Sequence, residues 1–279
     1  MKIAIIGTGI SGLGAAYLLH PHHDVTVYEK DTRIGGHSRT VDVFIDGKKT
    51  PVDTGFIVLN DRNYPLLTGL FAHLNVPIQK SDMSFGASID NGYLEYGSKG
   101  MFAQKRNLLR PAYWRMLCDI LRFNREAASY LHRSDDITLA QCLDELHMGD
   151  WFRRYYLQAM GAAIWSCSIE TILKFPARSF IQFFHNHGLL TVNGHPQWYT
   201  VTGGSRAYVE KLVASFRDRI RLDCGAKSVT RTNDGVSVTD TQGATNTYDH
   251  VIFACHGDHA LALLADADTN EQSILGAFT

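Results

Sequence analysis

Three glycines near the N-terminus give the clearest indication of chemical function, because their spacing suits a phosphate ligand. Gly7, Gly9 and Gly12 follow the apolar run Ile3–Ile6 and open a stretch of helical character, Leu13–Leu19. The first glycine permits a tight turn, the second lets the backbone approach a pyrophosphate, and the third lets helix and strand pack closely. The unpaired N–H groups and the dipole at a helix N-terminus favour negative charge. The spacing therefore predicts a dinucleotide-binding turn.

An acidic residue stands where such a fold binds the adenosine ribose. A second apolar stretch, Val25–Tyr28, ends at Glu29, 22 residues after Gly7. A carboxylate there accepts hydrogen bonds from the ribose and would repel a 2′-phosphate, which argues against NADP. We therefore expect a strand–helix–strand unit of a dinucleotide-binding domain. The residues expected to lie beside the ligand here also include Ile10, Ser11 and Lys30.

A second glycine-rich loop, residues 33–40, follows with the sequence RIGGHSRT. Its paired glycines let another backbone segment approach the ligand, and Arg39 can neutralise phosphate. Here the sequence resembles the flavin-containing amine oxidase superfamily, in which an Arg-x-Gly-Gly turn runs along the FAD pyrophosphate toward the flavin. The resemblance implies FAD as the cofactor. It also implies that this loop lines the cofactor through Arg33, Gly35, Gly36, His37, Ser38 and Arg39.

Three later segments carry the same resemblance. They are VDTGF at 52–56, TGGS at 202–205 and YDHVIFAC at 248–255, although Cys255 and the two residues after it replace the usual ending of the last one. The cofactor residues implied here are Thr54, Gly55, Phe56, Val229, Ala254 and Cys255. Within the superfamily, PQW at 196–198 ahead of GGSR most resembles bacterial predicted FAD-binding oxidoreductases. That group is similar to the N-terminal part of plant cyclopropane fatty-acid synthases.

The composition of the chain is that of an ordinary globular protein and argues against several other classes. The chain has 279 residues, 45% of them hydrophobic and 20% charged, with a net charge of −1, so nothing points to a nucleic-acid partner. Five cysteines without a CxxC pair favour reduced thiols in the cytoplasm. No charged-then-apolar leader and no membrane-spanning run are expected.

The order of elements predicts an α/β fold, in which an α+β, largely helical substrate domain is inserted into a Rossmann-type FAD-binding domain. We assign 1–75 and 200–279 to the FAD-binding domain and 76–199 to the substrate domain. Because relatives continue past the returning strand, we expect a C-terminal part of the flavin site to be absent. The expected elements are a hairpin over 84–96, helices over 111–187 and 205–217, an extended stretch over 189–202, strands at 221–224 and 227–232, a hairpin over 236–248, and a buried strand at 251–254.

The resemblance implies a FAD-dependent oxidoreductase that removes a hydride from a C–N or C–C bond of a small or lipid-like substrate. The alternatives are an amine or polyamine oxidase, a nicotinamide-dependent dehydrogenase, and a non-catalytic flavin-binding fragment or partner subunit. No catalytic residue is assigned, although Trp198 and Tyr199 either approach the substrate or pack in a strand. Cys255, His256 and His259 form a C-H-x-x-H pattern without a CxxC partner, so no metal is expected.

Residues 99–125 combine seven basic residues, a single acid and a tryptophan at roughly helical apolar spacing. Such a segment can lie on an anionic membrane surface. It can equally be a core-facing helix with a solvated basic face. Both interpretations stay open on the sequence.

Overall fold

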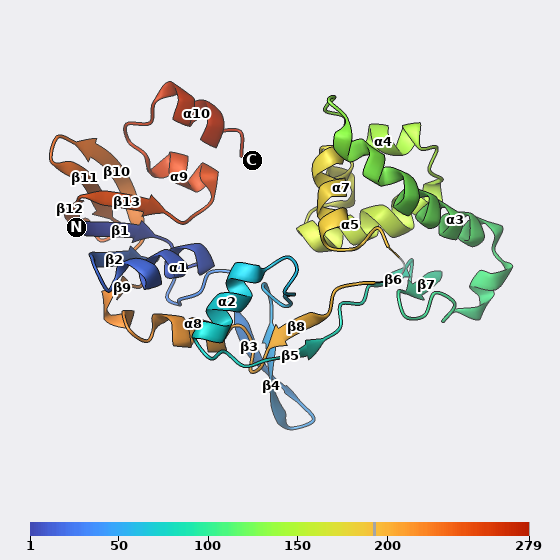
Figure 1. Ribbon diagram of the computed structural model, residues 1–279, viewed down its shortest axis with the longest axis horizontal. Coiled ribbons are helices and arrows are strands. Elements are labelled where there is room, and N and C mark those ends of the chain that lie inside the picture. The colour runs from blue at the N-terminus through green and yellow to red at the C-terminus, as the bar shows by residue number, and fades with distance from the viewer. Residues whose placement is uncertain (192–193, 279) are drawn as a thin grey trace. The chain divides into compact units, whose positions relative to one another are not determined.

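The computed structural model describes residues 1–191 and 194–278, which form two compact units (Figure 1). Unit 1 comprises residues 1–58, 66–79 and 199–279, and unit 2 comprises residues 59–65 and 80–198. Each unit is described by itself below.

The strands are β1 (Lys2–Ile6), β2 (Asp24–Tyr28), β3 (Thr40–Ile45), β4 (Lys48–Asp53), β5 (Ile78–Ser81), β6 (Gly86–Ile89), β7 (Leu94–Gly97), β8 (Trp198–Val201), β9 (Ile220–Arg221), β10 (Ala226–Thr232), β11 (Gly235–Asp240), β12 (Thr245–Tyr248) and β13 (His250–Phe253). The α-helices are α1 (Ile10–Leu19), α2 (Pro65–His73), α3 (Pro111–Glu126), α4 (Leu139–Glu145), α5 (Gln158–Trp165), α6 (Ile169–Ile172), α7 (Ala177–Asn186), α8 (Arg206–Val213), α9 (Gly257–Leu263) and α10 (Thr269–Leu275). The shorter helical turns are η1 (Lys105–Leu109), η2 (Ala127–His132), the π-helical η3 (Phe152–Leu157) and η4 (Arg217–Arg219).

A four-stranded parallel sheet in the order β13-β1-β2-β9 is the centre of unit 1. In β1, the four residues from Ile3 to Ile6 are all buried, as expected for a parallel strand that is covered on both faces. Helix α1 connects β1 to β2, so the predicted strand–helix–strand unit is confirmed. The carboxyl end of β1 therefore leads directly into the glycine-rich turn.

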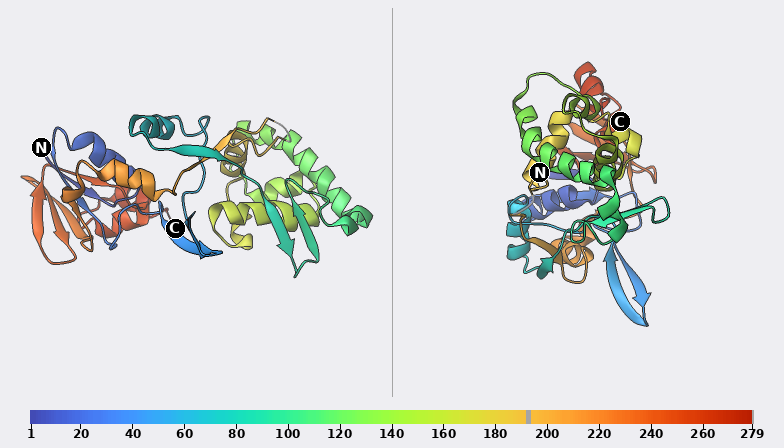
Figure 2. Two further views of the ribbon diagram at one scale, coloured as in Figure 1. Left: turned by 90° about the horizontal axis from the view of Figure 1, so that it is seen from below. Right: turned by 90° about the vertical axis from the view of Figure 1, so that its right-hand side faces the viewer.

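Unit 1 also contains two antiparallel elements. One is the three-stranded sheet β10-β11-β12, and the other is the hairpin β3–β4, which Figure 2 shows as a projecting blue ribbon. The hairpin turns through Asp46 and Gly47, both with positive φ (50° and 75°), which fits an Asp-Gly turn. Its tip exposes Phe44 (75%) to solvent. The sequence analysis did not assign this hairpin, although the Asp-Gly pair was a usable signal.

Asp53, at the end of β4, connects three segments of unit 1. Its carboxylate accepts hydrogen bonds from the hydroxyl of Thr40 (2.6 Å), the hydroxyl of Ser205 (2.8 Å) and the N–H of Ser205 (2.9 Å). Arg206, next in the chain, pairs with Asp42 of β3 through both guanidinium nitrogens. These bonds fix the start of α8 against the β3–β4 hairpin.

Unit 2 is mainly helical, with one short hairpin, β6–β7. In α7, Ala177, Phe180, Ile181 and Phe184 are buried at i, i+3, i+4 and i+7, so one face of the helix enters the core. The rings of Phe180 and Phe184 stack at 4.4 Å between centroids. Most of the aromatic residues of the predicted insertion lie in this hydrophobic core or against it.

Several expected elements differ from the observed ones. The hairpins over 84–96 and 236–248 and the mostly helical stretch over 111–187 are confirmed. Within the stretch expected to be extended, 189–202, the strand occupies only Trp198–Val201, and Leu189 and Leu190 instead lie in a turn. Residues 192–193 lie outside the described residues. The expected strand at 221–224 is wrong beyond Arg221, because Asp223 takes a left-handed conformation (φ 50°). The helix over 205–217 ends at Val213, and the final strand, β13, is half-buried.

Replacing Asp53 with alanine tests the anchoring role of this carboxylate. We expect Asp53→Ala to lower the free energy of unfolding by about 2–3 kcal/mol, because hydrogen bonds to a charged group are lost and the N–H of Ser205 loses its acceptor. Chemical denaturation measures the change. Asp234→Ala, in an exposed turn of the same unit, is the control and should change stability by less than about 0.5 kcal/mol. Equal effects of the two substitutions would contradict the assignment.

Candidate functional site

The turn between β1 and α1 offers unpaired backbone N–H groups. Gly9 is the N-cap residue of α1, and no described side chain caps the helix. Ile10 and Ser11, in the first helical turn, are exposed. A Cβ atom on Gly9 would have no described atom within 4 Å, whereas one on Gly12 would lie 1.9 Å from the carbonyl oxygen of Gly7. Gly12 is therefore required by packing, and Gly9 leaves open space in front of the helix.

The second glycine loop lies directly against this turn. The N–H of Gly35 donates to the carbonyl oxygen of Thr8 (3.1 Å), and a Cβ atom on Gly36 would lie 3.0 Å from the Cα atom of Gly9. Both loop glycines have positive φ (115° and 55°). Arg33 closes the loop by donating to the carbonyl oxygen of Gly36 (2.8 Å). The structure thus brings together two predicted cofactor segments that are more than twenty residues apart in the chain.

A third predicted segment runs alongside the second. The N–H of Thr54 donates to the carbonyl oxygen of Arg39 (2.9 Å), and the N–H of Phe56 donates to that of His37 (3.2 Å). A Cβ atom on Gly55 would lie 2.2 Å from the carbonyl oxygen of His37, so only glycine fits between these backbones. We call residues 7–12, 33–39 and 54–56 the glycine cradle.

The side chains of His37 and Arg39 are exposed, whereas Ser38 is buried. Its hydroxyl shares a hydrogen bond with the hydroxyl of Tyr208 on α8, and the Tyr208 ring packs edge-on against that of Phe56 (6.2 Å). Burial raises the pKa of Tyr208, so its hydroxyl stays protonated at neutral pH. Sequence reasoning missed Tyr208 as a support of the cradle, since a single tyrosine on a helix gives no distinguishing signal.

Glu29 is buried, and the chain itself holds its carboxylate. One oxygen accepts from both the N–H (2.9 Å) and the hydroxyl of Thr8, and the other accepts from the N–H of Asp31 (2.9 Å). A carboxylate has about four lone-pair positions, so one acceptor position remains on the second oxygen. Thr8, which the sequence analysis did not single out, is fully buried and fixes the acid beside the cradle. Lys30 follows Glu29 and is exposed.

Ala254 and Cys255, after β13, also reach the cradle. A Cβ atom on Gly7 would lie 2.6 Å from the carbonyl oxygen of Ala254, and the N–H of Ala254 donates to the carbonyl oxygen of Ile6 (2.9 Å). Cys255 is half-buried, and desolvation raises the pKa of its thiol. By contrast, the side chain of Val229 in β10 is buried in a core cluster. None of the described contacts joins Val229 to the cradle.

The histidine-rich turn after β13 lies next to the cradle. The ring of His256 stacks on that of His37 (6.0 Å), and His259 stacks on His256 (5.4 Å). One ligand atom each of His256, Asp258 and His259 lies within 4.8 Å of the others, and all three residues are exposed. The distances between these three ligand atoms are short enough for them to bind one metal ion. The expectation that this turn holds none stays a prediction.

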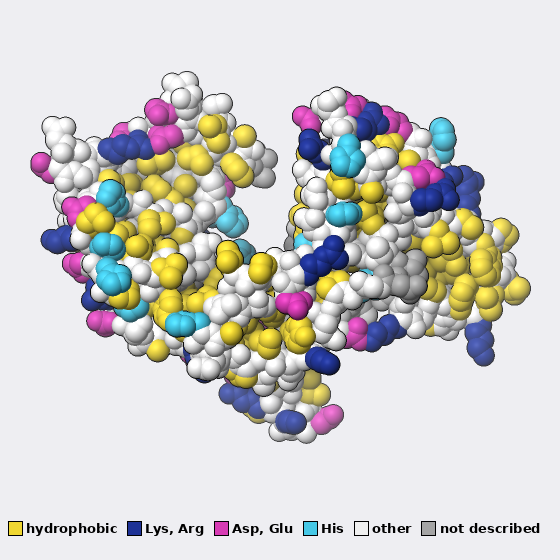
Figure 3. Space-filling view, viewed as in Figure 1, with side chains coloured by type: hydrophobic (Ala, Val, Ile, Leu, Met, Phe, Trp, Pro, Cys, Tyr) yellow, Lys and Arg dark blue, Asp and Glu magenta, His cyan; other side chains and the backbone are white. Residues whose placement is uncertain are grey.

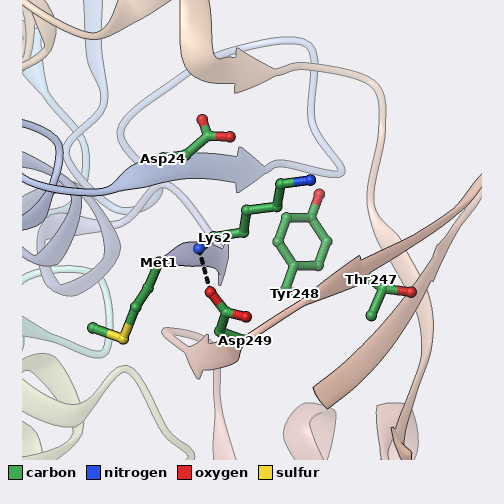
Figure 4. A pocket seen from close by; sticks show the side chains of 6 residues that line it. All are labelled: Met1, Lys2, Asp24, Thr247, Tyr248 and Asp249. Atoms are coloured by element: carbon green, nitrogen blue, oxygen red, sulfur yellow. Dashed lines mark hydrogen bonds between the residues drawn. The ribbon is translucent and has the colours of Figure 1, made fainter. Parts of the chain in front are cut away.

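Two other features lie apart from the cradle. The hollow in Figure 4 is lined by Met1, Lys2, Asp24, Thr247, Tyr248 and Asp249, with the N–H of Lys2 donating to Asp249 (2.7 Å). Lys2 and Asp24 are the first residues of β1 and β2, so this hollow lies at the amino edge of the parallel sheet, whereas dinucleotides bind beyond the carboxyl edge. Trp198 is buried in β8, and Tyr199 is half-buried.

The cradle fits a dinucleotide. An uncapped helix N-terminus and the open space at Gly9 suit a pyrophosphate, and the free acceptor position of Glu29 suits a ribose hydroxyl. Arg39, on the neighbouring loop, is exposed and can neutralise phosphate charge. The cradle therefore offers groups that suit the binding of a dinucleotide, but these groups do not identify a reaction.

Comparison with known proteins agrees with this geometry. The family model described as flavin containing amine oxidoreductase matches residues 10–272. Among solved structures, cyclohexylamine oxidase from Brevibacterium oxydans IH-35A has a TM-score of 0.74 at 20% identity, over 99% of this chain and 62% of that one. Putrescine oxidase bound to putrescine has a TM-score of 0.71 at 17% identity, over 99% and 63%.

A third solved structure, a CLA-producing fatty acid isomerase from P. acnes, has a TM-score of 0.65 at 16% identity, over 98% of this chain and 63% of that one. The comparison with curated proteins finds no relative of this sequence. In these three comparisons the chain spans somewhat under two thirds of the length of the solved structure. Their similarity confirms an α/β FAD-binding fold, while the similarity to cyclopropane fatty-acid synthases is not shown.

Gly9, the N-cap residue of α1, and Gly14, within that helix, allow a matched test of the cradle. Both have open space at the Cβ position, but only Gly9 faces the expected pyrophosphate. We expect Gly9→Ala to leave folding intact and to weaken FAD binding roughly tenfold or more, because a methyl group enters the space that the pyrophosphate needs. Gly14→Ala should keep the affinity and stabilise the helix by about 0.5–1 kcal/mol. Flavin fluorescence titration and thermal unfolding measure the two effects, and equal affinities would refute this placement of the cradle.

Alkylation of Cys255 tests whether the turn after β13 borders the cofactor. At pH 8 we expect iodoacetamide to modify the exposed Cys118 faster than Cys255, because the raised pKa of Cys255 leaves little of the reactive thiolate. Raising the pH should speed the modification of Cys255, since more of that thiol ionises. FAD should slow the modification of Cys255 and leave that of Cys118 unchanged. Peptide mass spectrometry follows both, and an absence of protection by FAD would remove Cys255 from the site.

Proposed function

The chain belongs to the flavin-containing amine oxidoreductase family, and we propose that it is a FAD-dependent oxidoreductase that removes a hydride from the C–N carbon of a small amine. Its cofactor is FAD. The observation that carries the proposal is the close approach of Gly36 to Gly9, which joins two loops around one dinucleotide site. A nicotinamide-dependent dehydrogenase has no need of that second loop.

We assign FAD binding to unit 1 and substrate binding to unit 2. The N–H groups at the start of α1 would hold the pyrophosphate, and the remaining acceptor position of Glu29 would hold a ribose hydroxyl. Thr54, Gly55 and Phe56 would extend this contact toward the flavin ring, supported from behind by Tyr208. These assignments keep the predicted cofactor residues except Val229, whose burial in a core cluster does not support such a role.

The chain's own residues would act by position and charge. When bound, FAD supplies the hydride acceptor at N5 of the flavin ring. The backbone bonds between residues 37–39 and 54–56 hold one edge of the cradle fixed. Arg39 offers a cation for phosphate charge, and burial keeps the hydroxyl of Tyr208 protonated. Chemistry of this kind needs no strong acid or base from the chain, which agrees with the lack of an assigned catalytic residue.

A lipid-like substrate oxidised at a C–C bond is the second candidate. The observation that favours it is the structural similarity to a fatty acid isomerase. The aromatic residues of unit 2 do not distinguish the candidates, because most of them form or contact its core. Two of the solved relatives are named for amine oxidation, which favours the amine.

Flavin reduction by substrate tests the proposal directly. The purified chain, loaded with FAD and desalted, is expected to retain a visible flavin band. Under anaerobic conditions we expect an amine from a panel that includes putrescine and cyclohexylamine to bleach that band, because the hydride reduces the flavin. Bleaching by an unsaturated fatty acid instead would support the second candidate. A retained flavin that no compound reduces would favour a non-catalytic flavin-binding subunit, and a chain that retains no FAD would contradict the proposal.

A further inference from the structure

One face of unit 2 combines exposed apolar side chains with basic side chains that make no ion pair in the described chain. Figure 3 shows hydrophobic side chains gathered over the end of unit 2 that contains η1 and the start of α3, with Lys and Arg at the margins. We call the exposed residues of segment 99–125 the η1–α3 face. For this segment the sequence allowed two interpretations, a segment that lies on an anionic membrane surface and a core-facing helix with a solvated basic face.

Helix α3 shows that the face is more than the outer side of an ordinary surface helix. Its inner residues, which include Tyr113, Met116 and Phe123, are buried and pack in the core of unit 2. Its outer stripe nevertheless exposes Trp114 (45%) and Leu121 (58%). The helix therefore exposes apolar side chains on the face opposite to the one that packs in the core of unit 2.

The turn before α3 extends this apolar surface. Leu109 is exposed to 86%, Leu108 to 47% and Phe102 to 38%. The Trp114 indole donates to the carbonyl oxygen of Leu108 (3.0 Å), and its ring lies 5.3 Å from that of Phe102. Together with Leu121, these residues form a grouped apolar surface and not scattered single exposures.

The charge of the face has one sign. Of the seven basic residues in the segment, four make no ion pair within the described chain, namely Lys105, Arg106, Arg110 and Arg115. Lys99 pairs with Asp82, and Arg125 pairs with Glu126. The single acid of the segment, Asp119, is buried and is bonded to Arg122 and to the N–H of Gly149 (3.0 Å). Arg106 donates to the carbonyl oxygens of Gly92 and Tyr93, and the half-buried Arg110 donates to Tyr93 and lies over its ring (4.4 Å), so both are held in place without a neutralising acid. The apolar side chains are thus accompanied by positive charge that no described acid neutralises.

We propose that the η1–α3 face docks on the surface of an anionic lipid bilayer. Exposed leucine, tryptophan and phenylalanine side chains can enter the boundary between headgroups and acyl chains, while the long stems of Lys and Arg leave their charges at the phosphates. Charge complementarity selects this occupant, because the same face on a second copy of the chain would meet its own positive charge. The described helices offer no membrane span, so the contact is peripheral. It rests on unit 2 alone and does not depend on the proposed oxidation.

Vesicle flotation tests the docking with a matched pair of double variants. Leu109→Ser/Lys105→Glu changes the η1–α3 face, and Leu66→Ser/Lys48→Glu changes equally exposed residues of unit 1 by the same chemistry. We expect the unchanged chain to float with phosphatidylcholine vesicles that contain phosphatidylglycerol, and to lose this binding at high salt. The first variant should partition about tenfold less, since each basic residue near the surface contributes several-fold. The second variant should float like the unchanged chain.

Cys118 gives a second measurement that does not depend on any variant. It lies on the exposed side of α3, so anionic vesicles should slow its alkylation while leaving that of Cys255 unchanged. The proposal fails if the chain does not float, if it floats equally with neutral vesicles, or if the first variant floats unchanged. Self-association through this face, or capture of an acidic protein without any binding to lipid, would also overturn it.

Discussion

The site depends on one steric constraint, which is that two backbone segments pass each other without side chains between them. Gly36 approaches within contact distance of Gly9, and the same pair of loops is joined by the hydrogen bond from Gly35 to Thr8. A side chain at Gly36 would press against the Cα atom of Gly9 and push the two loops apart. The position of the third segment follows from that of the second, since Gly55 packs on the carbonyl oxygen of His37. The whole cradle is therefore built from backbone, and the side chains around it serve to hold it in place.

The nucleotide-binding half could be predicted because its signals are local. Gly7, Gly9, Gly12 and Glu29 lie at spacings that one strand–helix–strand unit dictates, and the structure places the glycines in that turn and the acid beside it. Tyr208 and Asp53 could not be found in this way, because their importance comes from partners more than 150 residues away. Val229 was carried over from a resemblance and its side chain, in β10, is buried in a core cluster, so its role at the cofactor stays a prediction.

Unit 2 shows how far a pattern of polar and apolar residues can be read. The periodicity predicted that residues 111–187 are mostly helical, and α3 begins that stretch, but periodicity does not say which of two apolar faces meets the core. In the structure, the face with Tyr113 and Phe123 packs in the core, and the face with Trp114 is exposed to solvent. The end of a strand was harder to predict, because at 221–224 a single left-handed residue, Asp223, decides it.

The carboxylate of Glu29 has a consequence for how cofactor choice evolves in such a fold. Thr8 donates to it through both its N–H and its hydroxyl, and Thr8 also accepts the bond from Gly35. The acid that discriminates between nucleotides is thus part of the mechanical support of the glycine turn. Replacing it by a neutral residue to admit a 2′-phosphate would leave the donors of Thr8 unpaired in a buried place. The same carboxylate therefore determines nucleotide preference and stabilises the glycine turn. A substitution of Glu29 that changes the preference would need a compensating substitution at position 8 to keep the turn stable.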